Sequence, residues 1–456
     1  MQPARAPGNE HCFRDGAVGC PWRACAVTVL FLATFFILLL LGTPIAFVLA
    51  LTGLVGIYLS PGGSQILPVV PQEIFRSLNS FPLLTIPLFI LAGSIMSETG
   101  IAKRLMDLAE GTVGRGKGGL GAATVASTMF FHGISGSSTA DTAAIARVVL
   151  PSLKTQGYPV PFSTALLAAA GATATLVPPT IDLIIIGVIA NISIAGLFAA
   201  GIIPAIINGL ALIGMVIYLS RRSGYGIVVP PRSLREHLMS FVRAVPALFM
   251  ILIILGGILG GAFTPTEASV VAVLYGLFIS TFVYREFRIA HITPILRSTV
   301  LLTGVVMLVI AGSAVLSYAL MINQLPQQLA ETLRELTSDP LVFLLLVQVI
   351  FFFAGMMMDG LPALLVAMPI LMPIARDLGI DPIHFGILVE ANVALHLAMP
   401  PVGMCLNVAC AVSRLPVERV IRPLLPFIGI LVVTTLVITY VECFSVFLPR
   451  FLGLDK

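Results

Sequence analysis

Two proline-marked segments of this chain share one spacing. Pro151 lies 27 residues before the Pro-Pro pair that begins at Pro178, and Pro373 lies 27 residues before the pair that begins at Pro400. A shift of 222 residues superimposes the two segments. Proline lacks a backbone donor and interrupts helices, so breaks are expected at matching places in the two halves of the chain. The spacing therefore predicts two structural repeats.

The composition indicates a membrane protein. Hydrophobic residues make up 58% of the chain and charged residues 10%, whereas soluble domains contain about 25% charged residues. Eight stretches are nearly free of charge, and several approach the ~20 residues that cross a bilayer: 27–42, 44–59, 81–97, 195–219, 244–262, 265–284, 300–322 and 423–448. Broken helices at corresponding places in two halves of such a chain are typical of transporters, with the binding sites at the breaks.

We predict an all-α polytopic membrane protein with two inverted repeats, each of about five transmembrane helices, one re-entrant helical hairpin and one broken helix. Residues 1–26 are a polar extension, 27–219 the first repeat, 220–243 a cytoplasmic linker and 244–456 the second repeat. The hairpins are expected at about 120–156 and 340–376, and the broken helices at about 162–190 and 383–412.

Basic residues predict the orientation. Four Lys/Arg clusters are expected in the cytoplasm, where such residues are enriched: 103–117, 221–243, 285–297 and 414–422. An odd number of crossings per repeat inverts the second repeat and places the N-terminus outside. The arginines at 5, 14 and 23 oppose that placement, so the orientation of the first crossing stays open. Two amphipathic segments, 102–110 and 325–334, are expected to lie along the membrane surfaces.

The first predicted hairpin tip is polar. His132, Ser135, Ser137 and Asp141 lie within a small-residue run between apolar flanks. Hydroxyl and carbonyl oxygens suit a small hard cation, although close helix packing through small residues is the alternative. An acidic residue at membrane depth is costly without a role, which favours an ion or substrate site. His132 and His396 are interpreted as packed polar side chains rather than proton carriers.

The Pro-Pro breaks offer a different chemistry. Each is followed by a half-helix whose N-terminus favours anions. Asp359 is the acidic counterpart of the first tip in the second repeat. Asp182, Glu267 and Glu390 are further carboxylates in apolar surroundings, and some of them are expected to satisfy buried helix ends.

Several longer motifs resemble one family. They are Ser80–Phe89, Ile134–Asp141, Gly256–Ala268, Gly379–Ile387 and Pro400–Gly403. Together they are similar to the large membrane (permease, DctM-like) subunit of TRAP transporters, the tripartite ATP-independent periplasmic systems. The resemblance covers nearly everything after residue 26.

The resemblance implies sodium-coupled symport of an organic anion, such as a C4-dicarboxylate, across the bacterial inner membrane by an elevator motion. It implies no enzymatic activity, no cofactor besides the coupling sodium ion, and two partners: a small four-helix membrane subunit and a periplasmic binding protein. The implied substrate-binding residues are Ser137, Ser138, Pro178, Pro179, Thr180, Asn392, Pro400 and Pro401. The implied sodium ligands are Ser135, Ser137, Asp141, Gly171, Thr175, Gly355, Asp359 and Gly360.

Two positions depart from the family pattern. His396 stands where a small residue is usual, and Asp182 stands where an apolar residue or proline is common. Their roles, the substrate and the sodium stoichiometry stay open. Two alternatives remain as well: an ion-coupled anion transporter or exchanger of related fold that works without partners, and a membrane-embedded enzyme, for which the chain shows no convergent catalytic set.

Overall fold

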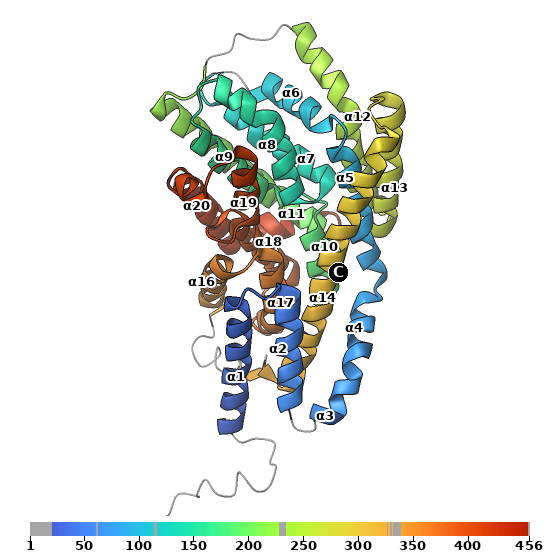
Figure 1. Cartoon of the computed structure of the whole chain (residues 1–456), viewed down its shortest axis with the longest axis vertical. Helices are drawn as coiled ribbons and strands as arrows, with labels where there is room; N and C mark the ends of the chain where they lie inside the picture. The colour runs from blue at the N-terminus through green and yellow to red at the C-terminus, as the bar shows by residue number, and fades with distance from the viewer. Residues whose placement is uncertain are drawn as a thin grey trace, which may run out of the picture. The chain divides into compact units, whose positions relative to one another are not determined.

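The computed structural model describes residues 21–60, 63–113, 116–227, 234–325, 327–328, 331 and 339–454. These residues form helices and connecting turns, with no strand among them (Figure 1). The all-α prediction is therefore confirmed. The chain divides into two compact units. Unit 1 comprises Met1–Asn79 and Val305–Arg334, and unit 2 comprises Ser80–Gly304 and Glu335–Lys456.

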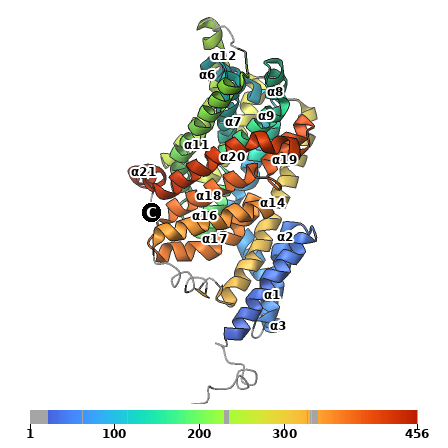
Figure 2. The same ribbon diagram turned by 90° about the vertical axis from the view of Figure 1, so that its left-hand side faces the viewer.

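Unit 1 is built on the close approach of two helices. Its elements are α1 (Pro21–Leu40), α2 (Ile45–Leu59), α3 (Gly63–Ile66), η1 (Leu67–Val69), α4 (Val70–Leu78) and the second half of α14 (Ile292–Ile322). A Cβ at Gly53 of α2 would lie 2.7 Å from the backbone nitrogen of Leu316 in α14, so only glycine permits this contact. Asn323 Nδ2 donates to Ser60 Oγ (3.1 Å), which joins the ends of the two helices (Figure 2).

Unit 2 contains the remaining helices and both predicted hairpins. Its elements are η2 (Phe81–Leu84), α5 (Thr85–Ser97), α6 (Ile101–Val113), α7 (Gly119–Ser135), α8 (Ser138–Thr155), α9 (Val160–Ala174), α10 (Ile181–Ala190), α11 (Ile194–Ser223), α12 (Leu234–Leu259), α13 (Pro265–Phe278), the π-helix η3 (Ile279–Val283), η4 (Ile289–His291), the first half of α14, α16 (Pro340–Met357), α17 (Gly360–Asp377), α18 (Pro382–Ala398), α19 (Met404–Ser413), α20 (Val417–Tyr440) and α21 (Cys443–Phe451).

Seven helices in the described part of the chain are long and apolar enough to cross a membrane, or eight if Gly63–Leu78 and Phe81–Ser97 form one broken span. The C-terminal limit of one apolar stretch was wrong. The stretch 423–448 is two helices, because α20 ends at Tyr440 and α21 starts at Cys443. Glu442 and Arg450 form an ion pair on the short C-terminal helix, which keeps these charges at an exposed surface.

The amphipathic segment 102–110 is confirmed as part of α6. Its apolar side is buried at Leu105 and Met106, whereas Lys103 is exposed. Arg104 of this helix pairs with Glu286 (2.7 Å) and lies 3.9 Å from the ring centre of Tyr284. The hydrogen bond from Arg104 lowers the pKa of the Glu286 carboxyl. Most of the segment 325–334 and of the extension 1–26 lies outside the described residues, although α1 already begins at Pro21.

Helix boundaries in unit 2 recur along the chain. The hairpin α7–α8 and broken helix α9–α10 correspond to the hairpin α16–α17 and broken helix α18–α19. The second arms start at Ser138 and Gly360, 222 residues apart, and the broken helices start at Val160 and Pro382, again 222 apart. Both Pro-Pro bonds at the breaks are cis. The proposed repeat limits and linker remain predictions.

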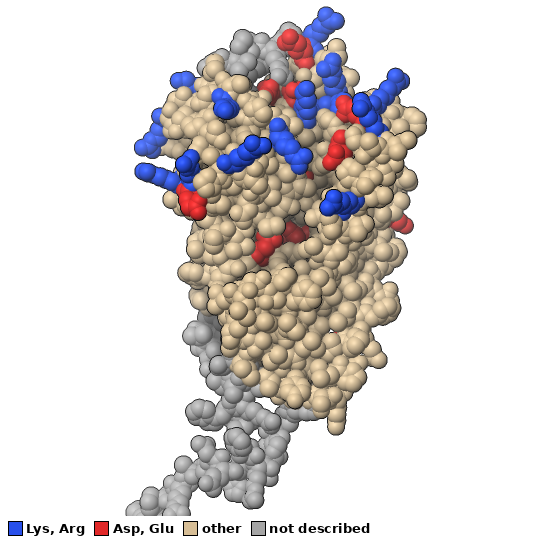
Figure 3. All heavy atoms as spheres, in the orientation of Figure 1, with Lys and Arg blue, Asp and Glu red and all other residues tan. Residues whose placement is uncertain are grey.

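The bases of the two hairpins lie at opposite ends of α11. Near the end of α11, Tyr225 has its ring 6.5 Å from that of Tyr158, at the base of the first hairpin. At its start, Gly196 packs beside Ile383, which follows the second hairpin. A helix of 30 residues spans about 45 Å. Lys and Arg side chains gather in the upper part of the face shown in Figure 3, over α6, α8 and α12 of unit 2. The inversion of the second repeat relative to the first stays a prediction.

We expect the two hairpin bases to open on opposite sides of the membrane. Cysteine replacements of the exposed residues Lys154 and Asp377, each introduced into a variant lacking the six native cysteines, should react with an impermeant thiol reagent from opposite sides. Labelling of Lys154→Cys from the cytoplasmic side follows from the basic clusters at that end. If both positions label from the same side, the inverted repeat is wrong.

Candidate substrate and ion site

The tip of the first hairpin is a tight turn between two helices. α7 ends at Ser135, Gly136 follows with φ +65°, and Ser137 starts α8 as its N-cap. The left-handed conformation at residue 136 closes α7 through a hydrogen bond from its amide to His132 O (2.8 Å), and it favours glycine. The turn therefore places three serines at the hairpin tip: Ser135 at the end of α7, and Ser137 and Ser138 at the start of α8.

Asp141 organises the interior of this tip. His132 Nδ1 lies 2.6 Å from Asp141 Oδ2, and Ser135 Oγ donates to Asp141 Oδ1. The Ser137 amide donates to Ser135 Oγ (3.2 Å). His132, Ser135 and Asp141 are all buried. The structure thus brings together three predicted sodium ligands and adds a histidine to them.

The tip is bonded to the first broken helix. Ser138 Oγ forms a hydrogen bond with Thr175 Oγ1, at the end of α9. Thr142 Oγ1 donates to Ser138 O (2.7 Å) and occupies the space that a Cβ at Gly171 would need. Ser138, Thr175 and Gly171, which the sequence assigned to substrate or sodium, therefore meet at one contact between α8 and α9.

The first break lies directly behind the tip. Pro178 and Pro179 are buried, and the Pro179 carbonyl oxygen is 3.1 Å from an ideal Cβ at Gly136. Thr180 is 2% exposed and is the N-cap of α10, but its side chain makes no capping hydrogen bond. Asp182 follows in the first turn and is half-buried. The N-terminus of α10, which favours negative charge, therefore already has the Asp182 carboxylate in its first turn.

The second hairpin is packed around His396. This histidine stacks on Phe351, with ring centres 5.7 Å apart, and its Nε2 donates to Phe351 O (2.6 Å). A Cβ at Gly355 would lie within 2.6 Å of three atoms of the imidazole ring. At the tip, Asp359 is the N-cap of α17, and its Oδ1 is buried without a hydrogen-bond partner in the described residues.

The second break lies beside this hairpin. A Cβ at Gly360 would press against Val393 of α18. Asn392 is fully buried; its Nδ2 donates to Leu388 O (2.8 Å) and its Oδ1 has no partner in the described part of the chain. Pro400 is half-buried and Pro401 is exposed. The site predicted at the Pro-Pro pair therefore has one open side.

The two breaks come together within unit 2. Ala172 of α9 packs with Leu397, Ala398 and Cys405 of the second broken helix. The second arm of each hairpin also packs on the half-helix of the other repeat, α8 on α19 and α10 on α17. Figure 1 shows these elements next to one another, and acidic atoms are visible near the middle of the face in Figure 3. The geometry is that of a single polar centre built from two hairpins and two broken helices.

Comparison with known proteins assigns this architecture. The family model for the tripartite ATP-independent periplasmic transporter, DctM component, matches residues 32–444. The chain belongs to the DctM family. It is therefore the large permease of a TRAP transporter, a multi-pass protein of the bacterial inner membrane. Such a permease works with a small membrane subunit and a periplasmic binding protein.

Two relatives illustrate the range of the DctM family. The C4-dicarboxylate TRAP transporter large permease protein DctM of Pseudomonas aeruginosa is 38% identical over 84% of this chain and 90% of its own length. The sialic acid TRAP transporter large permease protein SiaM of Vibrio cholerae is 35% identical over 91% of this chain and 97% of its own length. The solved YdaH transporter of Alcanivorax borkumensis has the same fold, with a TM-score of 0.63 at 16% identity over 91% of this chain and 98% of its own.

Sequence reasoning missed several contacts of this DctM-family site. It did not pair His132 with Asp141, Ser138 with Thr175, or Gly355 with His396. The nine-residue separation of His132 and Asp141 across a helix break was the one available signal. Glu267 forms a capping box with Thr264 at the start of α13, but it is exposed, so the helix end that it satisfies is not a buried one.

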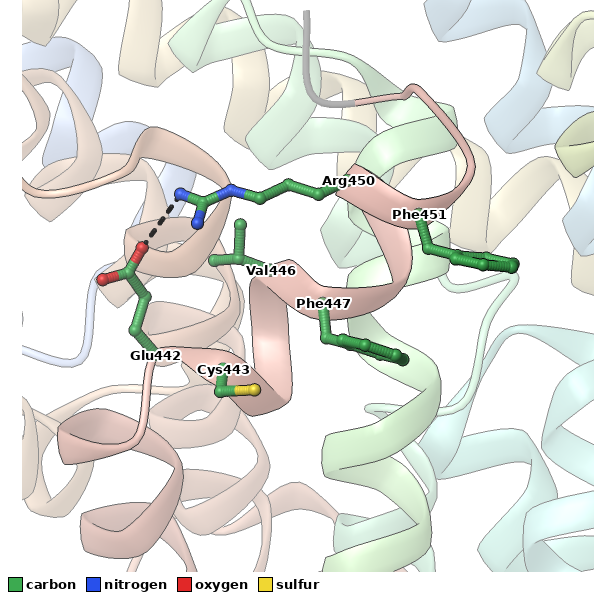
Figure 4. Close-up of a pocket in the computed structure, with 6 residues that line it drawn as sticks. All are labelled: Glu442, Cys443, Val446, Phe447, Arg450 and Phe451. Carbon is green, nitrogen blue, oxygen red and sulfur yellow. Dashed lines mark hydrogen bonds and ion pairs between the residues drawn. The ribbon is translucent and has the colours of Figure 1, made fainter.

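A shallow hollow of about 420 Å³ lies elsewhere, on the C-terminal helix α21 of the permease. Figure 4 shows its lining residues Glu442, Cys443, Val446, Phe447, Arg450 and Phe451. Arg450 Nη2 lies 3.2 Å from Glu442 Oε1 and 3.2 Å from Asp381 Oδ2. Because these contacts tie α21 to the start of α18, we interpret the hollow as a surface feature and not as the transport site.

Proposed function

We propose that this DctM-family permease imports an organic carboxylate by symport with sodium. The carboxylate class is supported by the two relatives above, named for C4-dicarboxylates and for sialic acid, which are all carboxylates. The two relatives differ in substrate, so the proposal is made at the level of the class.

The observation that carries the proposal is the oxygen-rich contact between the first hairpin tip and the first break. Ser135, Ser138, Thr175 and Asp141 present hydroxyl and carboxylate oxygens within one buried region. Oxygen ligands of this kind suit a hard cation. The proposed sodium ligands are Ser135, Ser137, Asp141, Gly171 and Thr175 around the first tip, and Gly355, Asp359 and Gly360 around the second.

The anion is proposed to bind where half-helices start. Thr180 precedes α10 and Gly403 precedes α19, and unsatisfied amides at such N-termini attract negative charge. The first turn of α19 contains no acidic residue, in contrast to that of α10. The proposed substrate-binding residues are Ser137, Ser138, Pro178, Pro179, Thr180, Asn392, Pro400 and Pro401.

Transport by such a centre is proposed to follow an elevator motion. The hairpins α7–α8 and α16–α17 and the broken helices α9–α10 and α18–α19 would move as one body, because they pack on one another around the breaks. The binding protein would deliver the substrate, and the small membrane subunit would support the static helices.

Uptake by vesicles tests sodium coupling. Vesicles that contain the permease and its small subunit, with the binding protein outside, should accumulate a labelled carboxylate when sodium is higher outside. With the membrane potential clamped at zero, a tenfold sodium gradient supplies about 1.4 kcal/mol per ion, enough for about tenfold accumulation. Equal accumulation after choline replaces sodium would overturn the coupling. Equal uptake without the binding protein would favour the unpartnered transporter instead.

A further inference from the structure

Glu390 is a buried acid that the proposed sodium and substrate sites do not use. It lies in the middle of α18, is 0% exposed, and neither of its carboxylate oxygens has a hydrogen-bond partner in the described residues. A charged carboxylate is strongly disfavoured in such a place, because nothing replaces the water that it loses. The neutral, protonated form avoids this penalty.

The groups around Glu390 do not supply a compensating charge. α18 packs against α9, α10, α11, α16, α17, α19, α20 and α21. Among their described residues, α9 and α16 carry no titratable side chain. The titratable side chains on the other elements and on α18 itself, together with the N-cap residues of α17, α18 and α21, are Asp182, Tyr218, Arg221, Arg222, Asp359, Arg376, Asp377, Asp381, His384, His396, Cys405, Cys410, Glu418, Arg419, Arg422, Tyr440, Glu442, Cys443 and Arg450.

The charge interaction that acts on Glu390 comes from Asp182, on α10. That neighbour is another acid, and in turn Asp359 and His132 act on Asp182. The two arginines of α11, Arg221 and Arg222, lie in the last turn of that helix, far from Glu390. The neighbouring residue Ala391 packs with Ala205, 16 residues earlier in α11, which corresponds to about 24 Å along the helix.

The part of α18 that carries Glu390 packs against elements of the first predicted repeat. Gly386, one turn earlier in α18, packs against Ile186 of α10 and Leu197 of α11. Ala391 packs with Leu176, at the first break. Glu390 is thus part of one broken helix, and the charge that acts on it, Asp182, is part of the other. Movement of the broken helices as one body relative to α11 and α20, which also pack on α18, would change the access of water to Glu390.

We propose that Glu390 binds a proton that is taken up and released during each transport cycle, so that the permease couples transport to protons as well as to sodium. The proton neutralises Glu390 while the helices packed around α18 enclose it. It leaves when the side chain reaches water, and the resulting charge then opposes re-entry of the empty centre. A cationic group on the substrate is the competing occupant of the same site.

Proton movement during transport is the first test, and this readout rests on the proposed carboxylate transport. Vesicles with the complete system and equal sodium on both sides should acidify inside when a carboxylate is added outside, as reported by an internal pH dye. In Glu390→Gln the number of protons moved per substrate should fall to zero, while exchange of labelled for unlabelled substrate continues. Glu390→Asp should restore proton movement. The exposed-site control Glu418→Gln should behave as the parent protein.

Three results would overturn the proposal. They are the absence of substrate-driven proton movement in the parent protein, undiminished movement in Glu390→Gln, and loss of exchange itself in Glu390→Gln with normal folding. The last result would assign the site to a cationic group of the substrate.

Infrared difference spectra of the purified permease do not depend on transport. One component of the carbonyl stretch of protonated carboxylic acids at neutral pH should be lost in Glu390→Gln and retained in Glu418→Gln. A spectrum unchanged by Glu390→Gln would overturn the proposal even if no substrate has been found.

Discussion

Replacement of Asp141 by alanine should abolish sodium-dependent uptake. The carboxylate is fully buried and accepts hydrogen bonds from both His132 and Ser135. Its removal leaves two polar groups of the hairpin tip without their partner, and removes the one charged ligand of the proposed first sodium site. Breaking a buried pair of this kind costs about 3–5 kcal/mol of folding free energy. A loss of similar size in the free energy of sodium binding would lower uptake at limiting sodium at least about 100-fold.

Two further variants separate the charge of Asp141 from its packing. Asp141→Asn keeps the size of the side chain and a hydrogen-bond acceptor, so it should fold better than Asp141→Ala yet still lose most of its sodium response. Glu98→Ala removes an exposed carboxylate at the end of α5 and should leave uptake unchanged. The sodium dependence of uptake is compared with thermal unfolding of each purified variant. A folded Asp141→Ala protein with normal sodium activation would exclude Asp141 as a ligand.

Replacement of Gly355 by alanine should destabilise the second hairpin. The added Cβ would overlap the ring of His396, which its stacking on Phe351 and its hydrogen bond to the Phe351 carbonyl hold in place. Overpacking of a core costs about 1–3 kcal/mol, more than the ~0.5–1 kcal/mol that alanine gains over glycine in a helix. We therefore expect a lower midpoint of thermal unfolding and weaker uptake.

The steric origin of this effect can be tested with His396→Ala. That variant alone leaves a cavity, but in combination with Gly355→Ala the new methyl group finds space, so the double variant should be more stable than the sum of the single effects by about 0.5–3 kcal/mol. Gly429→Ala in α20 is the matched control, since nothing lies within 4 Å of its added Cβ. This control should be neutral or slightly stabilised. Additive effects of Gly355→Ala and His396→Ala would show that the two residues do not compete for space.

The helix breaks were predictable from the sequence because their causes are local. A Pro-Pro pair cannot donate backbone hydrogen bonds, and α9 and α18 end near Pro178 and Pro400. The breaks expected at the single prolines Pro151 and Pro373 were wrong, because these residues lie inside α8 and α17. The resemblance of several motifs to the DctM family was likewise visible in the sequence and is confirmed by the match over residues 32–444. The split of the last apolar stretch into α20 and α21 escaped prediction, because Val441 and Glu442 contain no proline or glycine to mark it.

The partners of the polar side chains depended on tertiary packing. His132 could have been a free polar residue until the turn at Gly136 placed Asp141 against its ring. Glu390 resembles any other intramembrane acid in the sequence, and the packed helices show that its oxygens have no hydrogen-bond partner among the described residues. Backbone preferences act over a few neighbouring residues, so sequence patterns report them directly. Which buried groups meet depends on contacts between segments far apart in the chain, and those contacts form only when the helices pack.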